Sequence, residues 1–582
     1  MERMCRLLMA AVAVLITLVH EPVVGNGPDW LSDVDARIER ALRKEKVAGA
    51  ALVLVDQQGL VHTRGYGWAH RKKRQPFTAK TRFPFANITH VITAIAVLKL
   101  VENGKIGLDD PLSRLLPELA LENRFNGAAP PTLRQLLSHH SGLPSNVLAG
   151  YYAEEPQGQL APLPATLYLA QPPGRIYGYS NLAYAVLGHI VEAHSGRPYT
   201  EYVTEQVLKP LGMRNTGFAA TPGDATGHDR KRKPQPATYA SNVAALGLYG
   251  TAEDLSRLLQ FALGSGPDQV LGATLRAEMV RPQNADVPLD LDNVAGLGWQ
   301  LTNTEGFAVD RVLRINANTL HFRSNLVALP DQGLGIALVT NSANGVDFVV
   351  DQSREVMDEW LERSAGVAPP DRDASGFSDQ IPLPTRASAA AMDERYVTPL
   401  GLIDFEGKPD RYKMQFLGRG FRATRRDDGW YEMAYRLLGI FDIQFNIMEE
   451  ILLRPAALGG ERVLLALYQG QTFLLGTALP APGPTPPALA RLTGRYEIAN
   501  PDFFSEQLKL DLVELKIEDG QLVAEYRLPI FFRLTPKIPL SPGEADGVLF
   551  IPGLGTGLGE RVRFNPAEQT MTFSGYQFLR RN

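Results

Sequence analysis

FPFANITHVITAIAVLKLVENG, residues 83–104, is the stretch on which the fold of the chain depends. Apolar residues recur at helical spacing between Val91 and Val101, and small alanines occupy the remaining faces. The pattern predicts a helix that begins near Asn87, is stopped by Gly104 and is buried nearly all round. Its polar first turn would offer free backbone N–H groups to a cleft, which is a natural place for a nucleophile.

Continued through residues 105–111, this stretch resembles the first motif of the serine β-lactamase and penicillin-binding protein superfamily. The branch it resembles is the class C-like one, with esterases, D-aminopeptidases and DD-carboxypeptidases. There the helix opens with Ser-x-x-Lys, in which the serine attacks and the lysine, one turn later, helps to take its proton. Here the matching positions are Asn87 and His90. The surrounding residues of the motif are kept, but its serine nucleophile and its lysine are not.

A second motif is intact. Tyr179-Ser-Asn181 matches the family's Tyr-x-Asn, in which the tyrosine serves in proton transfer and the asparagine hydrogen-bonds the substrate amide. Three letters alone would favour a simple helix cap, since serine and asparagine are preferred there. Matching blocks at residues 192–196 and 209–213 favour the motif instead.

The third motif, Lys-Thr-Gly or His-x-Gly on an edge strand, is expected shortly before residues 325–342, which we interpret as the following strand. Counting back places it on Ile315-Asn-Ala317, where there is neither a basic residue nor a glycine. His321 is the nearest titratable residue, and it stands where the family usually has glycine. The third motif is therefore lost as well.

These losses bear directly on mechanism. Acyl-enzyme chemistry needs a nucleophile and a base, and the amide nitrogen of asparagine is too delocalised to attack a carbonyl. The chain has no Ser-x-x-Lys, Lys-Ser/Thr-Gly or Gly-x-Ser-x-Gly elsewhere. Loss of such a nucleophile costs on the order of a million-fold in rate. The family's oxyanion hole uses the backbone N–H of the nucleophile position, which survives here, so a ligand pocket is still expected. Its predicted residues are Asn87, His90, Tyr179, Asn181 and His321.

The resemblance covers most of residues 29–365 and implies an α/β fold, in which an antiparallel sheet is flanked by helices and joined to a helical subdomain. A linker is predicted over residues 366–391. Residues 392–479 and 488–582 lie on either side of a Pro-rich linker, 480–487. Both show alternating apolar and polar residues around Asp-Gly turns, which predicts hairpins with one buried face. We expect two small, barrel-like β-domains.

The net charge, the cysteine content and the N-terminal segment limit the binding partners and the cellular location that we expect. A net charge of −4 over 582 residues gives no reason to expect nucleic acid. Arg3 and Arg6 precede an apolar run that ends at Val19, which predicts a signal peptide over residues 1–25, with an uncleaved anchor as the alternative. The only cysteine, Cys5, lies inside this segment, so the mature chain would contain no disulfide. We expect a secreted or periplasmic protein with no later membrane span.

Two adjacent histidines, His139 and His140, are interpreted as structural, hydrogen-bonded residues, because neighbouring side chains diverge and would not share a metal. Neither a metal nor another cofactor is expected.

Three functions remain open. The first is a secreted pseudoenzyme that binds a small molecule or a peptide, peptidoglycan-like or containing D-amino acids. The second is an active hydrolase of esters, D-amino-acid peptides or β-lactam-like amides, with a rebuilt site. The third is a structural or partner-binding protein that works through its β-domains.

Overall fold

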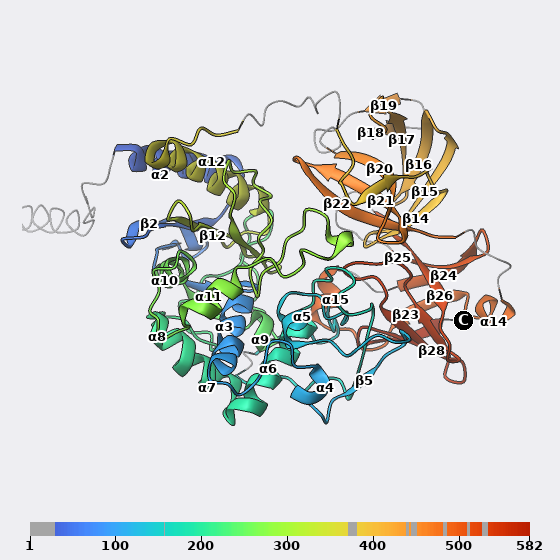
Figure 1. Ribbon diagram of the computed structural model, residues 1–582, viewed down its shortest axis with the longest axis horizontal. Coiled ribbons are helices and arrows are strands. Elements are labelled where there is room, and N and C mark those ends of the chain that lie inside the picture. The colour runs from blue at the N-terminus through green and yellow to red at the C-terminus, as the bar shows by residue number, and fades with distance from the viewer. Residues whose placement is uncertain are drawn as a thin grey trace, which may run out of the picture.

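The computed structural model describes residues 29–155, 158–370, 381–437, 441–443, 451–480, 486–508, 512–526 and 534–581. The expected signal peptide, residues 1–25, lies outside these ranges, as do parts of both expected linkers. Figure 1 shows a first unit on the left and two β-domains on the right, one above the other.

The first unit is built on an antiparallel sheet whose strand order is β10-β11-β12-β1-β2-β3. The central strands are largely apolar and are buried except for Asp56 at the end of β1, because helices cover both faces. Helices α2 and α12 pack on one face, and α3 and α10 on the other. The bounds are β1 Gly49–Asp56, β2 Leu60–His70, β3 Gln75–Pro76, β10 Leu313–Asn318, β11 Arg323–Leu329, β12 Leu334–Thr340, α2 Asp29–Lys44, α3 Ile88–Glu102, α10 Ala252–Ala262 and α12 Val346–Ala365.

The single strand expected over residues 325–342 was wrong. The structure divides this run into β11 and β12, which pair with each other as a hairpin. The turn contains Pro330, which has no N–H to give to a ladder, and Gly333, whose φ of +68° suits glycine. These two residues break a run that reads as uniformly apolar.

The helix α3 agrees with its prediction. It begins at Ile88 with Asn87 as the N-cap, and Gly104 follows its end with a φ of +67°. Every residue from Ile88 to Leu98 is buried. Because apolar residues surround most of α3, it meets polar groups chiefly at its two ends, at Asn87 before the first turn and at the Lys99–Glu102 ion pair in the last turn.

Further short elements complete this unit around α3. The helices are α4 Leu112–Leu115, α5 Leu133–Leu137, α6 Asn181–Ser195, α7 Tyr199–Val203, η1 Thr204–Leu208, α8 Lys209–Leu211, α9 Val243–Leu246, α11 Ala273–Met279 and η2 Pro288–Asp290. The strands are β4 Arg82–Pro84, β5 Ala120–Glu122, β6 Tyr152–Ala153, β7 Thr166–Tyr168, β8 Tyr239–Ala240 and β9 Tyr249–Thr251.

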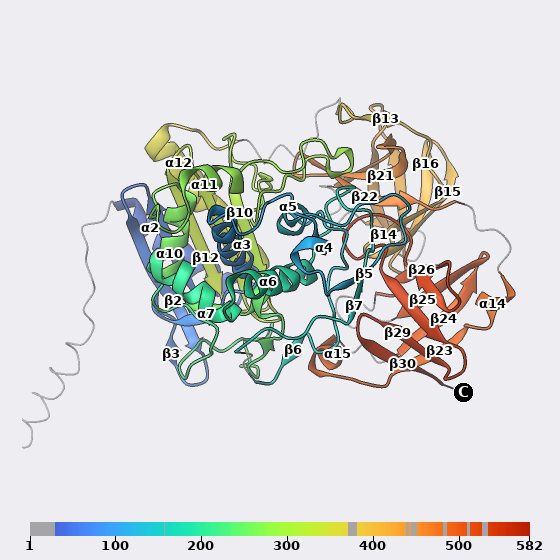
Figure 2. The same ribbon diagram turned by 60° about the horizontal axis from the view of Figure 1, so that its bottom comes forward.

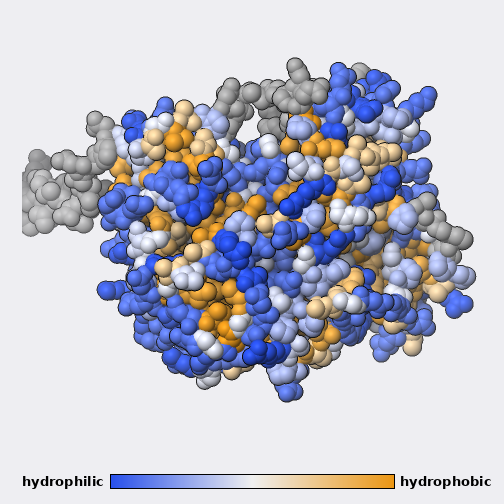
Figure 3. Space-filling model, in the orientation of Figure 1, coloured by the Kyte–Doolittle hydropathy of each residue, from blue (hydrophilic) through white to orange (hydrophobic). Residues whose placement is uncertain are grey.

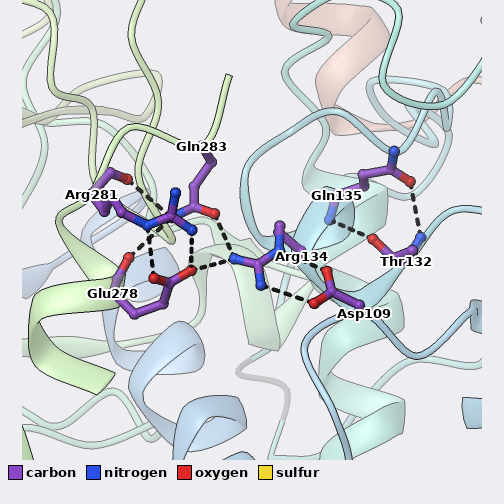
Figure 4. Close-up of polar contacts among 7 residues, drawn as sticks. All are labelled: Asp109, Thr132, Arg134, Gln135, Glu278, Arg281 and Gln283. Carbon is purple, nitrogen blue, oxygen red and sulfur yellow. Dashed lines mark hydrogen bonds and ion pairs between the residues drawn. The ribbon is translucent and has the colours of Figure 1, made fainter. Parts of the chain in front are cut away.

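A charged network ties α5 to α11 (Figure 4). Thr132 and Gln135 form a capping box at the start of α5. Between them, Arg134 donates from Nε to Asp109 at 2.8 Å and also hydrogen-bonds the carboxylate of Glu278. This network fixes the loop before α5 against the segment that follows α11.

Both C-terminal domains are eight-stranded antiparallel barrels, as the alternating sequence pattern predicted. In the first, β14 to β18 and β20 to β22 form a ring that the β18–β20 pairing closes, with β13 and β19 at its margins. Its strands are β13 Ala387–Ala389, β14 Arg395–Thr398, β15 Gly401–Lys408, β16 Arg411–Phe416, β17 Arg419–Arg425, β18 Tyr431–Leu437, β19 Phe441–Ile443, β20 Ile451–Leu458, β21 Glu461–Tyr468 and β22 Gln471–Ala478.

The second barrel, β23 to β30, closes through the β23–β30 pairing. Its β24–β25 hairpin turns at Asp519 and Gly520, which both have positive φ, as a type I′ turn requires. The bounds are α14 Pro487–Ala490, β23 Gly494–Ile498, α15 Phe503–Leu508, β24 Leu512–Glu518, β25 Gln521–Tyr526, β26 Lys537–Pro542, β27 Val548–Phe550, β28 Arg561–Asn565, β29 Thr570–Phe573 and β30 Tyr576–Arg581.

The second barrel packs against the first unit. The turned view places α15 of this barrel beside β6 (Figure 2). Hydrophilic and apolar residues are interspersed on the face drawn in Figure 3. Within the described ranges, no helix combines the length and the apolar character that crossing a membrane would need.

Candidate functional site

Asn87 is the N-cap residue of α3 and lies directly before its first turn. Ala86, the residue before it, has a φ of +48°, a left-handed conformation that costs a residue with a Cβ on the order of 1 kcal/mol. The side chain of Asn87 does not cap its own helix. It reaches instead to two other segments of the chain.

A directional chain of hydrogen bonds passes through the Asn87 amide. Its Oδ1 accepts from the backbone N–H of Asn318, at the end of β10, at 3.2 Å. Its Nδ2 donates to the hydroxyl of Tyr179, and that hydroxyl in turn donates to Oδ1 of Asn181 at 3.0 Å. Asn87 thus connects the third-motif strand to the second motif, and no member of this chain carries a charge.

His90 completes the chain from the side of the helix. Its Nε2 lies 3.0 Å from Oδ1 of Asn181, which can only accept, so this nitrogen carries a proton. The imidazole stacks on the ring of Tyr184, with 3.8 Å between ring centroids. Burial lowers the pKa of His90 to about 3, and its hydrogen bond to Asn181 opposes this only in part. His90 is therefore neutral at physiological pH.

Tyr179 is equally inert as a base. Burial raises its pKa well above that of free tyrosine, with neighbouring tyrosines adding to the effect. Its hydroxyl already accepts from Asn87 and donates to Asn181. The four predicted residues Asn87, His90, Tyr179 and Asn181 are thus brought together as expected.

A cavity of about 60 Å³ lies over this network. One wall is the loop 295–300, and the other is β10, through Arg314 and Asn316. Gly298 lets the loop approach α3, because a Cβ at this position would stand 2.8 Å from the Cβ of Ala94. The third motif is therefore replaced, at the same edge strand, by residues of different chemistry.

The fifth predicted residue, His321, does not line this cavity. It lies in the turn between β10 and β11, where its Cβ packs against Gly227. Burial lowers the pKa of His321 to about 4, with Arg323 adding to the effect. The β10–β11 hairpin turns this side chain away from the first turn of α3.

The two adjacent histidines are hydrogen-bonded, as predicted, but only one is remote from the cavity. His140 pairs with the carboxylate of Asp290 at 2.7 Å. His139 accepts at Nδ1 from the backbone N–H of Ser180, and its ring also lines the cavity. Ser180 itself caps α6 through the N–H of Ala183, so the second motif serves both the site and the helix start.

Sequence reasoning missed a contribution from the second barrel. Its loop 551–560 reaches the second motif, where Thr556 accepts from the backbone N–H of Tyr179 at 3.0 Å. Beside it, Gly557 donates to the hydroxyl of Ser145, and buried Glu560 accepts from the backbone N–H of Ser145. Burial raises the pKa of Glu560. The dense glycines of residues 553–559 were the only sequence signal for such a close approach.

Arg314 was also missed, although alternation along β10 puts it on the same face as Asn316 and Asn318. Within the part of the chain that the structure describes, no group of His, Cys, Asp and Glu side chains could hold a metal ion.

The sheet, its flanking helices and the three motif positions around the first turn of α3 define a β-lactamase-type fold. The family model described as "Beta-lactamase" matches residues 34–358, more than half of the chain. The chain belongs to this family.

Several known proteins are similar to part of this chain. Protein flp of Staphylococcus aureus (strain MW2) is 26% identical over 326 residues, which span 54% of this chain and 63% of flp. The chain thus covers less than two thirds of that relative. Esterase EstB of Burkholderia gladioli is 30% identical over 315 residues, or 46% of this chain and 77% of EstB. The solved structure of SurE with D-Leu is 22% identical, with a TM-score of 0.52, and covers 76% of this chain and 99% of SurE.

Proposed function

We propose that this protein is an exported pseudoenzyme of the beta-lactamase family, which has lost acyl-enzyme catalysis and binds a ligand at the cavity over α3. One observation carries the proposal. The position of the nucleophile holds an amide, and that amide is engaged on both sides, by Asn318 and by Tyr179. Residues 1–25 continue to predict a secreted or periplasmic destination.

The proton positions support the loss of catalysis. A general base needs a free lone pair near the nucleophile and a pKa near the working pH. His90 holds its Nε2 proton toward Asn181, and burial keeps its pKa at about 3. Tyr179 is a donor in the same network, with a pKa that burial raises. Neither residue meets the requirement.

The ligand-binding half of the site is better preserved. In active members of the family a substrate carbonyl is held by backbone N–H groups. Here the backbone N–H of Asn318 donates to Oδ1 of Asn87. The side-chain carbonyl of Asn87 thus takes the place that a substrate carbonyl would have. A ligand would either lie beside this amide or displace it. We propose a peptide-like or D-amino-acid-containing ligand, a class supported by the intact Tyr179 and Asn181 and by the D-Leu named for SurE.

Catalysis is tested by hydrolysis and covalent labelling of the mature protein with a chromogenic β-lactam, a p-nitrophenyl ester and a fluorophosphonate. We expect the natural chain to be silent with all three probes. The Asn87→Ser/His90→Lys variant restores the motif residues, and its labelling at position 87 would show that the frame is still competent. Labelling or turnover by the natural chain would instead identify an active hydrolase with a rebuilt site.

Binding is tested with Tyr179→Phe and Asn181→Ala, measured by calorimetry against D-amino acids and muropeptide fragments. We expect both changes to weaken the same ligand, because each removes a polar group from the network. If every ligand that binds is unaffected, the retained pocket is refuted, and a role carried by the two barrels becomes the better account.

A further inference from the structure

Arg314 is a buried cation beside the network of Asn87, Tyr179 and Asn181. Its residue is only 6% exposed, and it lines the same cavity as Asn87 and His90. It comes from β10, one residue before the segment Ile315-Asn-Ala317 that stands in for the third motif. A fully charged guanidinium in this place needs an explanation.

Glu305 balances the charge of Arg314, but the guanidinium donors have no hydrogen-bond acceptor in the part of the chain that the structure describes. Nε of Arg314 lies 3.4 Å from a carboxylate oxygen of Glu305, and the Glu305 side chain has no exposed surface. That contact lacks hydrogen-bond geometry, and Nε has no hydrogen-bond partner. Across the described residues, no acceptor is hydrogen-bonded to any nitrogen of this guanidinium. Unpaired buried donors are costly, on the order of 1–3 kcal/mol each.

Two other donors of the same cavity also have no hydrogen-bond partner within the described ranges. Nε1 of Trp299, a residue 3% exposed, is buried and has no partner. The hydroxyl of Tyr177 likewise makes no hydrogen bond within the described ranges, although both side chains line the cavity. Three donor side chains without a hydrogen-bond partner among the described residues therefore line one small space, which the side-chain amides of Asn87, Gln300 and Asn316 also line.

We propose that Arg314 is the anchor for a carboxylate, so that the cavity takes the carboxyl end of a small acid or peptide. This inference rests on the proposed binding function and specifies its ligand class. A carboxylate is planar, offers about four lone-pair sites and can take two parallel N–H bonds from one guanidinium. Because Glu305 already offsets Arg314, any anion bound here adds uncompensated negative charge, and a carboxylate adds less of it than a doubly charged phosphate.

The size of the cavity agrees with this ligand class. About 60 Å³ admits one group of a few atoms, so the remainder of a longer ligand would lie outside. Asn316, on the same strand face and exposed, stands where it could meet that remainder. The anchor is a feature of this chain, because it uses the residue before the third-motif position rather than the motif itself.

The test compares N-acetyl-D-leucine with N-acetyl-D-leucinamide, which differ only in the carboxylate, by calorimetry on the full chain. We expect the acid to bind at least tenfold more tightly than the amide. Arg314→Met/Glu305→Gln removes both charges together, so no buried charge is left unpaired, and it should abolish the preference while keeping amide binding. Arg311→Met, at an exposed arginine that pairs with Asp331, is the matched control and should keep the preference.

Each other outcome is decisive. Equal binding of the acid and the amide, or a preference that survives in the double variant, overturns the carboxylate anchor and leaves the proposed pocket standing. If neither compound binds, the anchor and the proposed binding function both fail. Should the double variant not fold, Arg314→Lys keeps the balance with Glu305 but loses the two-point contact, and the preference must fall several-fold for the inference to hold.

Discussion

Two polar networks hold the first unit together, and they differ in charge. Around Asn87 every member is uncharged, and His90 is kept neutral by burial, which lowers its pKa to about 3. Around Arg134 the network is built on the ion pairs with Asp109 and Glu278, and the hydrogen bond from Arg281 helps to lower the pKa of Glu278 to about 2 (Figure 4). The network that connects α5 to α11 is therefore charged, whereas the network at the positions of the catalytic motifs is uncharged.

The two networks lose stability over different pH ranges. For His90 the unfolded chain binds a proton near pH 6.5, whereas the folded chain does so near pH 3, so its contribution is complete above 6.5 and falls as the pH decreases toward 3. For Glu278 the contribution is complete above about 4.5 and falls as the pH decreases toward 2. Acid therefore affects the site before it affects the charged network.

The largest expected effect follows from His90. His90→Gln should flatten the decrease in unfolding free energy between about pH 6.5 and pH 4, which one histidine can steepen by at most about 1.4 kcal/mol per pH unit. Urea denaturation at several pH values measures it, and His189→Gln on α6 controls for the loss of an imidazole elsewhere. An unchanged slope in the His90 variant would mean that the folded protein accepts this charge.

A smaller effect is expected in how salt changes the unfolding free energy of variants in the two networks. Arg134→Met should lower the unfolding free energy by about 1–2 kcal/mol at low salt, and by less in about 1 M NaCl, because salt screens its partly exposed partners. Tyr179→Phe should cost a similar amount at both salt concentrations, since no charge is involved. Chemical denaturation of both variants tests this, and equal salt sensitivity would contradict the contrast.

The smallest expected effect comes from the second barrel. Thr556→Val removes the acceptor of the Tyr179 backbone N–H and should lower the melting temperature by the equivalent of about 1 kcal/mol. It should also weaken ligand binding, whereas Thr556→Ser, which keeps the hydroxyl, should change neither. A loss of stability without any change in binding would show that the contact only fastens the barrel.

The elements that were predicted correctly are those with a local signal. The helix from Ile88 to Glu102 has unbroken apolar spacing and a glycine stop, and Asp519-Gly520 is a strong hairpin turn between alternating strands. Tyr179 and Asn181 came from a motif that is followed by two further matching blocks, at residues 192–196 and 209–213. Residues 330–333 were misjudged because a continuous apolar run does not reveal where a buried strand turns.

The parts of the site that were missed have only weak local signals, namely the glycines of residues 553–559 and the alternation along β10. Arg314 reads as an ordinary polar residue of an alternating strand until the fold buries it with Glu305, and Thr556 lies in a different domain from the residue it supports. His321 was placed at the site by proximity in sequence, and the β10–β11 turn carries it elsewhere. Tertiary contact, rather than residue type, decided each of these cases.

The contacts of the loop 551–560 with the first unit determine how truncated alleles of this protein should behave. A premature stop codon just before it would leave every motif of the first unit intact in the translated product. Yet such a product would lack Thr556, Gly557 and Glu560, the groups that meet Tyr179 and Ser145. Natural alleles truncated in the last barrel should therefore behave as losses of the pocket, although the lesion lies far along the gene from the residues that form it.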